Sequence, residues 1–223
     1  MAHIDFHVVL DVLQAHHDGC PLCRFLGTAE GQYYQSLLYS WVGTEGFQDR
    51  FLAANGFCRT HARRLGECGD GVAVSMLYAP LLVHRRRWLS LRGRRNLFRR
   101  RRSPADQGRH AGTDACLLCK QRRQWEESFL GNLVRHGSVQ TPEGQALQQA
   151  YTAGWGLCFP HYRQLRSAHP TVPHWLQQFQ DTRMDDIAGE VESYLAALQE
   201  GRRVESGAPW KELLRFMEGT DQG

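Results

Sequence analysis

Apolar residues recur along most of this chain at the three- and four-residue intervals that place them on one side of a helix. Residues 4–17 carry one such stripe, residues 24–42 carry a second, and residues 175–199 carry a third. The stripes consist of Ile4, Val8, Val9, Val12 and Leu13, then Phe25, Tyr33, Leu37, Leu38 and Trp41, then Met184, Ile187, Val191, Tyr194 and Leu198. Each stretch is therefore predicted to be a helix with one buried face.

Start and stop signals divide the rest of the chain into shorter helices. Thr44 is a good first cap, and Asn55-Gly56 is a good left-handed stop. Thr141-Pro142-Glu143 combines a capping side chain, a proline suited to the first helical position and an acid that favours the helix dipole. Further helices are predicted over 45–55, 58–65, 72–91, 121–136, 142–153 and 209–219.

No segment shows the strict alternation of apolar and polar residues that indicates a strand. The fold class is therefore predicted to be all-α. We expect two pseudo-repeated helical modules and additional C-terminal helices. The expected domains are a first module over 1–91, an Arg-rich linker over 92–115 and a second module with the C-terminal helices over 116–223.

The repeat is clearest in a cysteine and histidine pattern that occurs twice. Each copy has a CxxC pair, a long insert, and then Gly, an apolar residue and CxxH. Residues flanking the motifs also correspond, since Phe51 and Tyr151 each lie seven residues before the third cysteine and Leu65 and Leu165 each lie four after the histidine. The two copies supply Cys20, Cys23, Cys58 and His61, and Cys116, Cys119, Cys158 and His161. Such self-similarity is typical of an internal repeat.

Thiolates and a neutral imidazole are the ligands that zinc prefers, and three cysteines with one histidine complete a tetrahedral structural site. The spacing suits this chemistry, because residues three apart at a helix start point to the same side and the helix N-terminus stabilises a thiolate. We predict two zinc ions, one pinning the base of a helical hairpin in each half. Exchange of CxxC and CxxH between the halves stays open. Iron–sulfur clusters are the alternative cofactor, since the same ligands can also hold them.

Charge is concentrated in one stretch. The whole chain has a formal charge of +4, whereas residues 84–102 contain ten arginines and no acid, so the remainder is net acidic. These arginines are Arg85, Arg86, Arg87, Arg92, Arg94, Arg95, Arg99, Arg100, Arg101 and Arg102. Contact with a polyanion, either nucleic-acid phosphates or an anionic membrane surface, is one interpretation. A solvated linker is the other.

Other features of the sequence limit the possible functions and compartments. The first residues lack the basic and apolar regions of a signal peptide, and no apolar run is long enough for a membrane span, so we expect a cytoplasmic protein. In a reducing cytosol, paired cysteines hold metal more often than they form disulfides. No catalytic triad, phosphate-binding loop or paired-carboxylate motif stands out, so no catalytic residue is assigned and an enzyme is not favoured. Cys68 lies outside the pattern, and nothing around it indicates an activated thiol.

The chain resembles an uncharacterised bacterial family whose members carry a CPLC motif and a GFCxxH motif in two halves. The resemblance rests on Cys20-Pro21-Leu22-Cys23, on Gly56-Phe57-Cys58-Arg59-Thr60-His61, on their second copies, and on the stretch from Tyr194 to Gly219. The second copy has Leu117 in place of proline and Leu157 in place of phenylalanine, and neither change affects a ligand. The resemblance supports the ligand assignment and implies no activity.

Two functional hypotheses follow. The first is a zinc-stabilised helical scaffold that binds a protein or a nucleic acid. The alternative is an iron–sulfur protein with two Cys3His-ligated clusters that acts in electron transfer or redox sensing.

Overall fold

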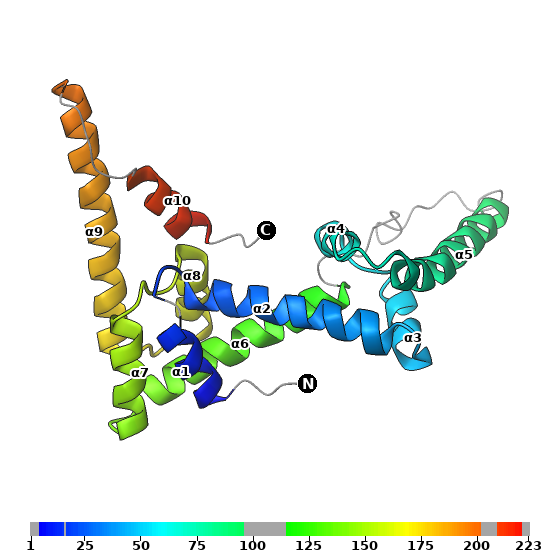
Figure 1. Ribbon diagram of the computed structural model, residues 1–223, viewed down its shortest axis with the longest axis horizontal. Helices are drawn as coiled ribbons and strands as arrows, with labels where there is room; N and C mark the ends of the chain where they lie inside the picture. The colour runs from blue at the N-terminus through cyan, green and yellow to red at the C-terminus, as the bar shows by residue number, and fades with distance from the viewer. Residues whose placement is uncertain (1–4, 16, 96–114, 202–208, 220–223) are drawn as a thin grey trace. The chain divides into compact units, whose positions relative to one another are not determined.

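The computed structural model describes residues 5–15, 17–95, 115–201 and 209–219, and within these ranges every regular element is a helix (Figure 1). The all-α prediction is therefore confirmed. The elements are α1 (Phe6–Ala15), α2 (Pro21–Ser36), a π-helical segment η1 (Leu37–Trp41), α3 (Glu45–Ala53), α4 (Arg59–Glu67), α5 (Gly71–Arg95), α6 (Leu117–Gly137), α7 (Pro142–Thr152), α8 (Phe159–Ala168), α9 (His174–Gln199) and α10 (Pro209–Glu218). None of the described helices is both long and apolar enough to cross a membrane.

The chain forms two compact units. Unit 1 comprises Met1–Thr28 and Trp125–Gly223, and unit 2 comprises Ala29–Gln124. The boundaries between the units fall inside α2 and α6, so each of these helices begins in one unit and ends in the other. This division does not follow the expected domain boundaries at 91 and 116. The α5 helix also continues to Arg95, four residues past the predicted end, and residues 96–114 of the expected linker lie outside the described part of the chain.

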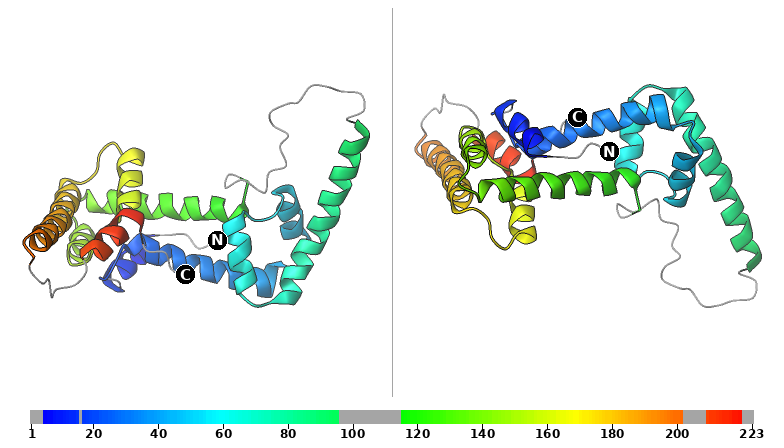
Figure 2. Two further views of the ribbon diagram at one scale, coloured as in Figure 1. Left: turned by 90° about the horizontal axis from the view of Figure 1, so that it is seen from above. Right: turned by 90° about the horizontal axis from the view of Figure 1, so that it is seen from below.

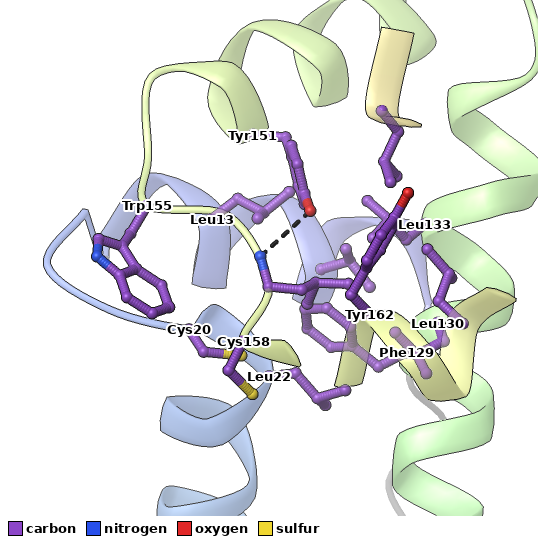
Figure 3. Close-up of a cluster of buried hydrophobic side chains, with 14 of the residues drawn as sticks. Leu13, Cys20, Leu22, Phe129, Leu130, Leu133, Tyr151, Trp155, Cys158 and Tyr162 are labelled. Atoms are coloured by element: carbon purple, nitrogen blue, oxygen red, sulfur yellow. Dashed lines mark hydrogen bonds between the residues drawn. The ribbon is translucent and has the colours of Figure 1, made fainter. Parts of the chain in front are cut away.

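Unit 1 is built around one apolar core. Helix α1 packs against α7, α7 contacts α9, and α10 packs against both α8 and α9 (Figures 1 and 2). The core includes Leu22 from α2, Phe129 and Leu133 from α6, and Tyr151 from α7, each almost fully buried (Figure 3). Full burial of such a side chain contributes about 1.5–3 kcal/mol, so this core stabilises the unit.

Unit 2 has a smaller core beneath its longest helix. The helix α5 packs against α3 and α4 and extends beyond them (Figure 2). Its inner face buries Leu77 and Leu81. Aromatic rings complete the core, since the ring of Phe51 from α3 lies 5.1 Å from that of Phe57 and 5.3 Å from that of Tyr78 on α5.

Several local signals are confirmed. Asn55 and Gly56 both have positive φ, at 60° and 85°, and end α3 as predicted. The Thr141 hydroxyl accepts a hydrogen bond from the Gly144 backbone N–H at 3.2 Å, which caps α7. Thr44 occupies the cap position of α3, but its hydroxyl donates to the Trp41 carbonyl and not to the helix.

The turn before each CxxH motif needs glycine for two reasons. Gly56 and Gly156 have φ of 85° and 82°, which disfavours residues with a Cβ atom. The space is also filled, because a Cβ on Gly56 would lie 2.7 Å from the Leu81 side chain and one on Gly156 would lie 2.3 Å from Gln180 Oε1. The glycine therefore lets a helix from elsewhere in each unit approach the turn closely.

A buried hydrogen-bond network fixes the second of these turns. Gln180 of α9 is fully buried, and its Oε1 accepts a bond of 2.8 Å from the Leu157 N–H while its Nε2 donates one of 3.0 Å to the Leu157 carbonyl. The Tyr151 hydroxyl donates to the same Oε1 at 2.7 Å. The Leu157 N–H also lies 3.2 Å from the Tyr151 hydroxyl oxygen, which accepts from it (Figure 3), so two buried side chains hold this N–H and Gln180 alone holds the carbonyl.

Replacing Gln180 with leucine tests this network. The Gln180→Leu variant should lower the free energy of unfolding by about 1–3 kcal/mol, because the buried Leu157 carbonyl and the Tyr151 hydroxyl proton would lose their partner and the Leu157 N–H would keep only its longer bond to Tyr151. Denaturant unfolding followed by circular dichroism gives the measurement. Gln178→Leu, at an exposed position of the same helix, is the matched control and should change stability little. An equal effect of the two substitutions would contradict this role for Gln180.

Candidate metal centres

Eight predicted ligand residues converge in two clusters, one in each unit. Site 1 contains Cys20, Cys23, Cys158 and His161, and site 2 contains Cys58, His61, Cys116 and Cys119. Within each cluster the four ligand atoms all lie within 4.8 Å of one another. Each cluster could therefore hold one metal ion.

The distances within the clusters are similar. In site 1, Cys158 Sγ lies 3.2 Å from His161 Nδ1 and 3.8 Å from Cys23 Sγ. In site 2, Cys58 Sγ lies 3.3 Å from His61 Nδ1 and 3.7 Å from Cys119 Sγ. The remaining sulfur–nitrogen pairs lie between 3.3 and 3.5 Å. In both sites the histidine faces the sulfurs through Nδ1.

The pairing of the motifs differs from the one we expected. The CxxC of the first half meets the CxxH of the second half in site 1, and the opposite exchange forms site 2. The expectation that each half supplies its own four ligands is wrong, and the exchanged arrangement that the sequence left open is the one observed.

Helix lengths explain the exchange. After Cys20, the 16 residues of α2 and the five of η1 carry the chain roughly 30 Å along the helix, at about 1.5 Å per residue. The nine residues of α3 can return only about 14 Å. In the second half, α6 has 21 residues and α7 has 11, so the same mismatch recurs. A hairpin with one long and one short helix does not by itself bring its two ends together at one ion.

Helix starts supply all eight ligands. Cys58 and Cys158 are the N-cap residues of α4 and α8, with extended backbones, and the histidines follow three residues later in the first turn. Cys20 and Cys116 directly precede α2 and α6, whose first turns carry Cys23 and Cys119. The exposed N–H groups of a helix start favour negative charge, so all six thiols lie where thiolates are stabilised. Figure 3 shows Cys20 and Cys158 with their sulfurs close together at the edge of the core.

A carboxylate approaches the far side of each histidine ring. Glu30 Oε1 lies 3.9 Å from His61 Nε2, and Glu126 Oε1 lies 4.0 Å from His161 Nε2. Such outer carboxylates orient a ligating imidazole and raise its basicity. The sequence reasoning missed both residues, although a signal was present, since each lies seven residues after the second cysteine of a CxxC motif.

Glu30 is held ionised by its surroundings. Its side chain is only 3% exposed and pairs with Arg64 at 2.6 Å and Arg122 at 2.7 Å. Burial alone would raise its pKa, but the neighbouring His61 imidazole and the charges of Arg122 and Arg64 outweigh burial and lower the pKa to about 2. A permanent negative charge therefore lies behind His61.

The clusters hold more ionisable groups than can be charged together without a cation. In site 1, burial and the neighbouring sulfurs raise the pKa of Cys20, while hydrogen bonds from Cys158 and Cys20 lower that of Cys23. Burial lowers the pKa of His161, yet its interactions with the sulfurs of Cys158 and Cys23 raise it to about 10. Protons thus balance the charge in the absence of a metal, and a bound cation would displace them.

The C-terminal helix covers site 1. Gly219, which ends α10 with φ of 82°, packs so closely that a Cβ atom there would lie 3.1 Å from Cys23 Sγ and 3.4 Å from Cys158 Sγ. Phe216 is buried against the ring of Trp155, and Glu212 accepts hydrogen bonds from Trp155 Nε1 and from Arg183. These contacts hold α10 over the sulfurs.

The remaining cysteine has a different environment. Cys68 is exposed at the end of α4, and its thiol donates to the Arg64 carbonyl at 3.4 Å. Partial burial and the charge of Glu67 raise its pKa. Nothing in its surroundings activates it as a nucleophile.

Paired serine substitutions test the exchanged ligand sets. A Cys20→Ser/Cys158→Ser variant removes two ligands of site 1 and should keep about one metal ion, because site 2 is intact. A Cys20→Ser/Cys58→Ser variant damages both sites and should lose both ions. Elemental analysis of purified protein gives the ratio of metal to chain. The reverse result, with one ion in the second variant and none in the first, would show that the halves do not exchange ligands. Cys68→Ser is the control and should keep both ions.

Gly219→Ala tests the cover over site 1. The added methyl group meets two sulfurs and a left-handed backbone, so α10 should detach more easily and release of one of the two ions to a chelator should accelerate. A loss of about 1–2 kcal/mol corresponds to roughly 5–30-fold. Gly201→Ala is the matched control, since Gly201 also has positive φ (68°) but open space around it. Equal release rates from the two variants would contradict a covering role for α10.

Comparison with known proteins places these features in a family. Residues 7–200 match a family of unknown function, DUF6062. An uncharacterised 23.9 kDa protein encoded in the xynA 3′ region of Caldicellulosiruptor sp. (strain Rt8B.4) is 22% identical over 177 residues, which cover 78% of this chain and 80% of that protein. No solved structure matches the chain. Since the match spans most of the sequence and both candidate metal centres, the chain belongs to the DUF6062 family.

Proposed function

We propose that this chain is a zinc-stabilised helical scaffold that binds a protein or a nucleic acid. The observation that carries the proposal is the mutual closeness of four ligand atoms in each site, all within 4.8 Å. Such a set surrounds one point in space. The scaffold part of the proposal is supported by the burial of six of the eight residues, since a largely enclosed ion suits a structural role.

The observed distances support a single tetrahedral ion. Zinc bonds of about 2.3 Å to sulfur and about 2.0 Å to nitrogen place sulfurs roughly 3.8 Å apart and a sulfur and a nitrogen roughly 3.5 Å apart. The sulfur–sulfur distances of 3.7 and 3.8 Å agree with these values. The sulfur–nitrogen distances of 3.2–3.5 Å are equal or slightly shorter.

The same geometry argues against the iron–sulfur alternative. A cluster distributes its protein ligands over several iron atoms that bridging sulfides hold apart. Ligands on different irons then point outward from the cluster, so they cannot all lie within the distance that separates the ligands of one ion. The compact sets in both units therefore favour a mononuclear metal.

A structural role is favoured over a catalytic one. Three cysteines and one histidine complete the coordination of a tetrahedral ion, whereas a catalytic zinc keeps one position open. Each ion would join segments distant in sequence, since site 1 connects residues near 20 with residues near 160 and site 2 connects residues near 60 with residues near 117. Closing such long loops is where a metal stabilises a fold most.

The thiolate ligands suggest the cellular compartment. Six metal-binding thiols suit a reducing compartment, so we propose that the protein works in the cytoplasm.

The arginine block supports an acidic partner only in part, because Arg85 donates to Asn55 Oδ1 at 2.9 Å and to the Asn55 carbonyl at 2.8 Å. Asn55 lies at the end of α3, so Arg85 is bound within its own unit. Arg99–Arg102 lie outside the described residues.

Metal analysis with an absorption spectrum, on protein purified without oxygen, tests the proposal. We expect about two zinc ions per chain, no visible absorption, and unfolding of both units when a strong chelator removes the metal. Iron with sulfide and a broad visible absorption would instead support the redox hypothesis. Full helicity and an unchanged melting temperature after complete metal removal would contradict the structural role.

A further inference from the structure

The helix α5 is apolar on two opposite faces. Its inner face buries Ala73, Leu77 and Leu81, which are 4%, 1% and 1% exposed. On the opposite side, Val72 is 73% exposed and Val83 is 50% exposed. A helix that is apolar all round is normally covered on all sides, so the outer face lacks a partner in the described part of this chain.

The outer face has the spacing of a helix-pairing seam. Val72, Met76, Ala79 and Val83 are separated by four, three and four residues, which is the repeat of core positions in a coiled coil. All four are exposed. Pro80 follows Ala79 and therefore lies about 100° around the helix from it, beside the seam and not in it.

We propose that this outer seam pairs with the α5 helix of a second copy of the chain in an antiparallel arrangement. The inference concerns an apolar helix surface and does not depend on which metal fills the sites. A symmetric pair uses the same patch on both copies, which is the commonest form of protein dimer.

One antiparallel register pairs every seam residue with an apolar residue. When Val72 faces Val83 of the second copy, Met76 faces Ala79, and the two-fold axis repeats both contacts. The long methionine then lies opposite the small alanine, so large and small side chains alternate across the seam as in a well-packed core. Four apolar layers form without any polar residue in the seam.

Charge favours the antiparallel arrangement over the parallel one. The C-terminal end of the seam leads into His84-Arg85-Arg86-Arg87, whereas Glu67 and Asp70 precede its N-terminal end. Antiparallel pairing brings the basic end of one copy near the acidic end of the other. Parallel pairing would instead place two arginine blocks side by side, and like charges at such close range are destabilising.

A nucleic acid is a poorer occupant for this face. Phosphates are recognised by cations and hydrogen-bond donors, whereas the seam offers only aliphatic and thioether groups. A nucleic acid bound through the arginines would leave the seam exposed. The seam therefore fits a second apolar helix better than a polyanion.

Analytical ultracentrifugation of the full metal-loaded chain tests the proposal. We expect dimers at concentrations up to about 100 µM, since a dissociation constant of micromolar order gives mostly dimer there. Met76→Glu and Ala79→Glu should each weaken dimerisation by roughly tenfold or more. Ala196→Glu, at an exposed position of α9, is the matched control and should leave the dimer intact. A monomer throughout this range, or a dimer that both seam variants retain, would overturn the proposal.

Disulfide trapping tests the direction of the helices. In a Cys68→Ser background, antiparallel pairing predicts that Met76→Cys and Ala79→Cys proteins crosslink when mixed but not when each is oxidised alone. Parallel pairing predicts crosslinking of each variant with itself, which would overturn the register. Metal content and the melting temperature, measured before oxidation, show that the variants are folded. They also separate a failure of this inference from a failure of the metal proposal.

Discussion

Each candidate metal centre gathers three thiols and an imidazole, and the repulsion between the thiolates can be balanced only by a cation or by protons. The ligand atoms of a site lie within 4.8 Å of one another at helix starts, where backbone N–H groups favour negative charge but do not neutralise it. Because the ligands of a site come from opposite halves of the chain, the balance of charge at one point fixes segments more than 50 residues apart. The arrangement of the helices around both sites depends on this convergence.

Residues around the candidate sites fix the backbone turn that precedes each CxxH motif. A glycine with positive φ precedes each CxxH motif, and a side chain from a distant helix fills the space where a Cβ atom would lie. In unit 1, Gln180 also satisfies the backbone of the apolar residue between that glycine and the cysteine. The G-φ-C sequence therefore encodes a close approach of another helix as well as a turn.

The sequence predicted the helices, the stop at Asn55-Gly56, the cap at Thr141 and the eight residues of the clusters, because these depend on local spacing and residue chemistry. It did not predict which motifs meet, because that depends on whether a helix can return to its starting point. The lengths of α2 and α3 favour the exchanged pairing, but helix ends predicted from sequence are too imprecise to give these lengths. Glu30 and Glu126 were missed for a related reason. Their role appears only when the ends of different helices are placed together.

The helix α2 carries ligands of one site and the carboxylate behind the histidine of the other. Cys23 lies in its first turn, and Glu30 follows seven residues, or two turns, later. Both residues belong to one continuous helix. The same helix therefore supplies a side chain to each candidate metal centre, so a break in this helix would affect both centres at once.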